Sequence, residues 1–107
     1  MKLKQLQCVL AVYEHGFSVT HASRALHLSQ PAVSKYIKSL EEQLNSPIFT
    51  RGSKSLLGLT DFGQEIMPLV VEMLKLGDEI VQCSAQKLAQ QDGVMYLPPQ
   101  IRWRLIV

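Results

Sequence analysis

The chain has 107 residues, of which 47% are hydrophobic and 19% are charged, a balance typical of a small soluble globular protein. It shows no signal peptide and no apolar run of membrane-spanning length, which argues against a secreted or membrane protein. Residues 1–60 hold seven lysines and arginines against three acids, whereas residues 61–107 hold four against six. A basic first half favours contact with phosphate.

The first predicted helix covers residues 3–17. Apolar residues recur along it at helical spacing, which predicts one face packed against the rest of the chain. Gly16 is expected to end it, since a glycine commonly follows the last turn of a helix. We expect this helix to share an apolar core with the two helices that follow.

A second helix is predicted to begin at Ser18, whose hydroxyl can accept a hydrogen bond from a free amide of the first turn. The pattern breaks at residues 27–29, and a third helix follows at once. Two helices joined by so short a turn indicate a helix-turn-helix over residues 18–44. The apolar face of the second helix is made by Val19, Ala22, Ala25 and Leu26.

The third helix is predicted to begin after Ser29, another N-cap residue. Pro31 falls in its first turn, where a missing N–H costs nothing. A stripe of apolar residues at helical spacing predicts the buried face. These residues are Val33, Tyr36, Ile37, Leu40 and Leu44.

The opposite face of the third helix is polar, and no acid appears before Glu41. It presents Gln30, Ser34, Lys35 and Lys38. Amide, hydroxyl and ammonium groups read base edges in the DNA major groove, whereas phosphate would repel a carboxylate there. The pattern therefore predicts a recognition helix. The alternative is an ordinary amphipathic helix with a solvated polar face.

Residues 47–60 predict a two-stranded wing, with residues 48–51 paired to residues 55–59 around a Gly-Ser tip. Arg51 and Lys54 lie at or beside this tip. Two cations on a narrow ribbon next to a recognition helix favour contact with phosphate or with the minor groove. The alternative is a solvated hairpin.

Thr60 is a good N-cap for a long helix that we expect to reach about residue 90. Apolar residues step along it by alternating four and three positions, as in a coiled coil. A lone helix this apolar is unstable in water and needs a partner. We expect the same helix of a second chain, the alternative being a helix folded back on its own domain. The predicted dimerisation residues are Phe62, Ile66, Leu69, Met73, Leu76 and Ile80.

Nothing in the sequence indicates a metal, a cofactor or a catalytic site. Cys8 and Cys83 lack metal-ligand spacing and are interpreted as reduced core thiols. The three histidines, His15, His21 and His27, do not share a helical face. Neither a glycine-rich phosphate loop nor a nucleophile motif is present, so we expect no enzyme activity.

The stretch SQPAVSKYIKSLEEQLNSPIFTR, residues 29–51, resembles the signature of the LysR-type transcriptional regulators. The match extends from residue 1 to about residue 88. Asn45 stands where the family usually has glycine, and both residues tolerate the left-handed conformation that ends a helix. The resemblance implies a winged helix-turn-helix that binds double-stranded DNA, with linker helices that pair to form a dimer.

The polar pattern and the resemblance together assign roles to individual residues. Gln30, Ser34 and Lys35 are expected to read or approach bases, and Pro31 to shape the start of the helix. Arg51 occupies the arginine position of the family's Phe-x-Arg motif. The residues expected to hold the DNA backbone are Ser18, Thr20, Lys38, Arg51 and Lys54.

From residue 91 the pattern fails, and a possible strand at residues 94–97 is stopped by two prolines. LysR-type regulators normally continue into an effector-binding domain, so the chain resembles only their DNA-binding and linker part. Read from one nucleotide upstream, codons for the PPQIRW stretch permit Ala-Thr-Thr-Asn-Thr-Leu-Ala. That sequence is similar to a stretch in the cysteine-regulon, CysB-like branch of the family. We therefore hypothesise a reading-frame change near Leu97 in a sulfur-assimilation regulator.

The expected fold is all-α with a small β-wing. It comprises a winged helix-turn-helix at residues 1–59, a linker or dimerisation helix at residues 60–90, and a tail at residues 91–107 that is a truncated or out-of-frame start of an effector domain. The expected function is sequence-specific binding of double-stranded DNA by a cytoplasmic, nucleoid-associated bacterial homodimer, without cofactor or membrane contact. The alternatives are an interaction module that pairs with full-length regulators of the same family, and a non-functional relic.

Overall fold

The computed structural model describes the backbone of residues 1–53 and 55–92, and the side chains of residues 1–53 and 55–85. Lys54, the possible strand at residues 94–97 and the hypothesised frame change near Leu97 lie outside the described residues. The chain divides into two compact units, residues 1–71 and a second unit that begins at residue 72. The predicted domain boundary after residue 59 falls inside the first unit.

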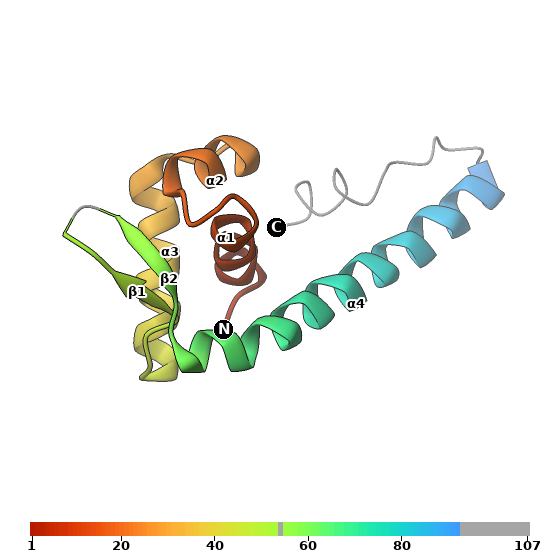
Figure 1. Ribbon diagram of the computed structural model, residues 1–107. Coiled ribbons are helices and arrows are strands. Elements are labelled where there is room, and N and C mark those ends of the chain that lie inside the picture. Colours follow the sequence, from red (N-terminus) through yellow and green to blue (C-terminus); the bar gives the residue numbers. More distant parts are fainter. Residues whose placement is uncertain (54, 93–107) are drawn as a thin grey trace. The chain divides into compact units, whose positions relative to one another are not determined.

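Three helices build the core of the first unit: α1 (Leu3–Glu14), α2 (Val19–Leu26) and α3 (Gln30–Leu44). Each packs against the other two (Figure 1). α1 ends earlier than residue 17, because Gly16 and Phe17 both adopt a left-handed backbone with φ of 66°. The fully buried apolar side chains of the three helices include Leu6, Cys8, Val9, Val12, Ala22, Val33, Ile37 and Leu40.

Local chemistry fixes the helix-turn-helix as predicted. The Ser18 hydroxyl accepts a hydrogen bond from the amide of His21, and the Ser29 hydroxyl accepts one from the amide of Ala32, each over 3.2 Å. Between the two helices, His27 takes a left-handed conformation and ends α2. Both predicted N-caps are therefore confirmed.

The apolar stripe of α3 is buried along most of its length. Val33, Ile37 and Leu40 are at most 1% exposed, and Tyr36 is half-buried. The expectation that Leu44 is buried is wrong, since its side chain is 37% exposed. Leu44 is the last residue of α3, and Asn45 then turns the chain away in a left-handed conformation with φ of 53°.

The wing consists of β1 (Phe49–Arg51) and β2 (Leu56–Leu59), which pair antiparallel. Phe49 faces Leu59 and Thr50 faces Gly58, with an irregularity between Thr50 and Arg51. The first strand starts one residue later than predicted. The amide and carbonyl of Ile48 are instead hydrogen-bonded to Glu41 and Thr60, outside the sheet.

The long helix α4 (Asp61–Asp92) begins in the first unit and continues in the second. The hydroxyl of Thr60 caps it by accepting from the amide of Gly63 over 2.9 Å. A Cβ at Gly63 would lie 2.2 Å from the carbonyl oxygen of Ile48, so this close approach requires glycine. Met67 and Val70 are buried in the first unit, on a different face from most of the predicted dimerisation residues.

The two cysteines have different environments. Cys8 is fully buried in α1, and burial raises the pKa of its thiol to about 11. The interpretation of Cys83 as a core thiol is wrong, because this side chain is exposed on α4. Its apolar helical spacing does not bury it, since that face of the helix lacks cover in the described part of the chain. No helix among the described residues is both long and apolar enough to cross a membrane.

Candidate nucleic-acid interface

The polar face of α3 is the centre of the candidate interface. Pro31 and the four predicted polar residues are all exposed, and the first turn of the helix contains no acid. The buried stripe on the other side of α3 anchors the helix to α1 and α2. The structure thus places a fixed, acid-free surface where base contacts were predicted. The residues of this surface are Gln30, Pro31, Ser34, Lys35 and Lys38.

A hollow of about 450 Å³ lies beside this face, between α1 and α3. Lys35 from α3 and Lys2, which precedes α1, both line it. The buried Gln5 fixes this junction, because its Nε2 donates to Ser39 Oγ over 3.3 Å and its Oε1 accepts from the Lys2 amide over 2.7 Å. The sequence pattern did not single out Lys2.

The start of α2 carries the predicted backbone residues Ser18 and Thr20, both half-buried. Besides capping the helix, Ser18 Oγ lies 2.9 Å from His21 Nδ1. The Thr20 carbonyl accepts from the hydroxyl of Ser23 over 2.8 Å. Ser18 Oγ thus already contacts both the amide and the ring of His21 within the chain.

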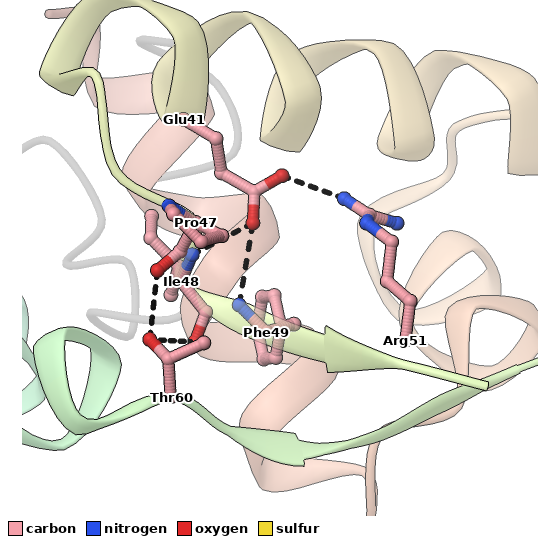
Figure 2. A network of polar contacts seen from close by, with 6 residues as sticks. All are labelled: Glu41, Pro47, Ile48, Phe49, Arg51 and Thr60. Carbon is pink, nitrogen blue, oxygen red and sulfur yellow. Dashed lines mark hydrogen bonds and ion pairs between the residues drawn. The ribbon is translucent and has the colours of Figure 1, made fainter.

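The wing places Arg51 next to an acid. Arg51 Nη2 donates to Glu41 Oε1 over 2.6 Å, while half of the Arg51 side chain remains exposed. Figure 2 shows Glu41 reaching from α3 to this guanidinium and to the first residues of the wing. Sequence reasoning treated Glu41 only as the first acid of the polar face. Its place four residues after Ile37, on the buried side, was the signal that it has a structural partner.

α4 exposes an apolar stripe, which we define as Leu69, Met73, Leu76 and Ile80. Their side chains are between 42% and 71% exposed, whereas Phe62 and Ile66 at the start of the helix are half-buried.

Within the described residues, no group of three or more His, Cys, Asp or Glu side chains could hold a metal ion.

Residues 3–64 match the family described as "Bacterial regulatory helix-turn-helix protein, lysR family". The chain belongs to the LysR family. It is 34% identical over 91 residues to the transcriptional regulator CysB of Thiocapsa roseopersicina, covering 85% of this chain and 67% of that one. It is 35% identical over 95 residues to CysB of Haemophilus influenzae, covering 89% and 29%. These names agree with the resemblance to the CysB-like branch.

A third relative, the regulator SsuR of Burkholderia cenocepacia, is 37% identical over 93 residues, with 87% of this chain and 30% of SsuR covered. The chain thus spans less than a third of the length of SsuR and of the Haemophilus CysB. These relatives are named as transcriptional regulators, not as enzymes.

Solved structures of LysR-family DNA-binding domains share the fold. The BenM DNA-binding domain in complex with catB site 1 DNA has a TM-score of 0.73 at 30% identity, covering 83% of this chain and 96% of that one. The CbnR DNA-binding domain in complex with DNA has a TM-score of 0.71 at 27% identity, covering 78% and 94%. The predicted family and the winged helix-turn-helix fold are therefore confirmed.

Proposed function

We propose that this LysR-family chain binds duplex DNA sequence-specifically, with α3 in the major groove. The observation that carries the proposal is the exposed polar face along the N-terminal half of α3, which has no acid before Glu41 and is held in place by the buried Val33, Ile37 and Leu40 on the other side. A recognition helix needs both properties, since it must present donors to base edges from a fixed position. The DNA complexes of BenM and CbnR domains with the same fold support this use of the surface.

In this proposal the residues divide by what they contact. Gln30, Ser34 and Lys35 approach base edges, and Pro31 sets the start of the helix. Contacts to phosphate orient the domain and carry no sequence information themselves. They are assigned to Ser18, Thr20, Lys38, Arg51 and Lys54.

The exposed apolar stripe of α4 supports a homodimer. Side chains of this size, repeated along one helical face, favour burial against a second helix of the same kind. A dimer would present two copies of α3, and its preferred site would be two-fold symmetric. In this arrangement α3 determines which bases are read, and α4 determines the spacing of the half-sites.

Selection of purified protein on random-sequence duplexes across a salt series tests the proposal. A two-fold symmetric site should be enriched, with affinity falling steeply as salt rises. Lys35→Ala should relax the preference at one position and cost about 1–3 kcal/mol of binding free energy. Lys75→Ala is the matched control, because Lys75 is an exposed cation of α4 outside the candidate interface. Unchanged base preference in Lys35→Ala would contradict the assignment of this residue.

A second candidate function rests on the same exposed stripe of α4. The chain would pair with other regulators of the family through this helix and alter their activity. Met73→Asp should then abolish the effect, while Lys35→Ala should leave it intact. Loss of the effect in Lys35→Ala as well favours DNA recognition by the chain itself.

A further inference from the structure

Glu41 is a buried acid whose carboxylate accepts hydrogen bonds from three donors. Its side chain is only 9% exposed. Oε2 accepts from the amides of Ile48 and Phe49 over 2.7 and 3.2 Å, and Oε1 accepts from Arg51 Nη2 over 2.6 Å. A buried carboxylate is costly unless such donors compensate its charge. The donors belong to Ile48, directly before the wing, and to Phe49 and Arg51 of β1, so one side chain of α3 holds both the backbone and the arginine of β1.

The other side of this junction is fixed by Thr60. Its hydroxyl lies 2.7 Å from the carbonyl oxygen of Pro47 and 3.2 Å from that of Ile48, and its amide donates to Ile48 over 2.9 Å (Figure 2). The backbone at Ile48 is therefore bound from α3 through its amide and from the residue preceding α4 through its carbonyl. This leaves the base of the wing little freedom, and the position of Arg51 is set relative to α3.

Arg51 uses only part of its hydrogen-bonding capacity at this contact. A guanidinium has five N–H donors in a planar fork, and Nη2 is the atom that donates to Glu41. The side chain is 51% exposed, so other donors of the fork can reach a group outside the protein. Because Glu41 is buried and its charge is compensated, it adds little repulsion toward a nearby phosphate.

We propose that Glu41 is a positioning residue for DNA binding, which holds the Arg51 guanidinium so that it bridges this carboxylate and a DNA phosphate. This inference rests on the proposed function, since it assigns a cause to one backbone contact. An arginine already ordered by Glu41 loses less side-chain freedom when DNA binds. Its charge-assisted bond to Glu41 also restrains the position of the guanidinium near the phosphate.

The test compares wild type, Glu41→Gln, Arg51→Ala and the double variant on the duplex selected by the wild-type chain, across a salt series. The salt slope is the slope of the logarithm of the DNA-binding constant against the logarithm of the salt concentration. Arg51→Ala should reduce its magnitude by about one. Glu41→Gln should reduce it similarly, with about three- to tenfold weaker binding, and the double variant should bind no worse than Arg51→Ala. Glu42→Gln is the matched control, because it removes the same charge from the neighbouring, exposed residue.

Two results would overturn the proposal. If Glu41→Gln lowers the melting temperature but matches Glu42→Gln in affinity and salt slope, Glu41 acts only in folding. If Glu41→Gln binds more tightly with a steeper slope, Glu41 competes with phosphate for Arg51. Either result, together with intact specificity in wild type and a relaxed base preference at one position in Lys35→Ala, would leave the proposed function standing. Wild-type protein without a preferred site would overturn both.

A second variant covers the case in which Glu41→Gln does not fold, as judged by circular dichroism. Arg51→Lys keeps Glu41 and the positive charge but replaces the planar fork by a single flexible ammonium. The bridge predicts binding at least about threefold weaker than wild type. Binding equal to wild type would show that charge alone is needed, and would contradict the role of Glu41.

Discussion

Helices α3 and α4 both repeat apolar residues every third or fourth position, but they differ in how these residues are covered. In α3, Val33, Ile37 and Leu40 are at most 1% exposed. In α4, Leu69 and Ile80 are 62% and 71% exposed. Periodicity alone indicates that a face needs a partner; it does not indicate where that partner lies.

The difference separates two uses of an amphipathic helix. The apolar face of α3 is satisfied by α1 and α2, so its polar face is free to meet a ligand. In α4 the apolar stripe itself is the exposed feature, which supports association through that face. Substitutions in the two stripes should therefore act on different properties, namely folding for α3 and association for α4.

The largest effect is expected from Leu40→Ala in the buried stripe. Removing a fully buried leucine side chain should lower the free energy of unfolding by about 2–5 kcal/mol. Urea denaturation of dilute protein measures this change. The control is Ile80→Ala, which under the same conditions should change stability by less than about 0.5 kcal/mol. Equal losses in the two variants would show that α4 is also covered within one chain.

Cys8 offers a second contrast with α4. Burial raises the pKa of its thiol from 9.0 to about 11. Well below pH 9 the thiol is protonated in both the folded and the unfolded state. Between pH 9 and 11 only the unfolded chain releases this proton, so stability should fall as pH rises, by at most about 2.7 kcal/mol.

Denaturation curves measured from pH 8 to about pH 11 test this expectation. Cys8→Ala should be less stable than wild type at pH 8 but should lose less further stability as the pH rises. Cys83→Ser, altered at an exposed thiol of α4, should follow the wild-type curve. If the unfolding free energy of wild type falls with pH in parallel with that of Cys8→Ala, the buried thiol does not contribute to the pH dependence of stability.

Features set by neighbouring residues were predictable from the sequence. Ser18, Ser29 and Thr60 cap helices through hydroxyls that bond amides three residues ahead, and Asn45 supplies the left-handed turn after α3. Such contacts depend on local chemistry alone. They fixed where the helices begin, and with them the face that α3 exposes.

Features that depend on distant parts of the chain were not predictable in the same way. Leu44 and Cys83 fit the helical patterns, yet both are exposed, because exposure depends on what lies opposite. Glu41 meets Ile48 and Arg51 only after the wing folds against α3. The helical pattern puts Glu41 on the buried side of α3, but no pattern within one helix specifies which residues it contacts, so the wing cation was predicted and its contact with Glu41 was not.

Association through α4 gives a third way to test the contrast between the helices. Met73→Asp places a charge in the exposed apolar stripe, so a dimer formed there should have a dissociation constant at least about tenfold higher, or about 1.4 kcal/mol. Sedimentation equilibrium measures the change. Glu72→Asp, at the adjacent exposed position, is the control and should associate as wild type. An unaffected dimer in Met73→Asp would place the interface elsewhere.

The smallest effect concerns two serines with different tasks, the N-cap Ser29 before α3 and Ser34 on α3. Ser29→Ala removes the hydroxyl that caps Ala32, and should cost about 1 kcal/mol of unfolding free energy. Ser34→Ala removes an exposed hydroxyl from the proposed base-reading face, and should change stability by less than about 0.5 kcal/mol. In DNA selection the order should reverse, with altered base preference in Ser34→Ala and the wild-type preference retained in Ser29→Ala. If both variants changed only stability, the polar face of α3 would be a solvated surface. Separate effects would instead show that the cap before α3 serves folding and that the polar face of α3 serves recognition.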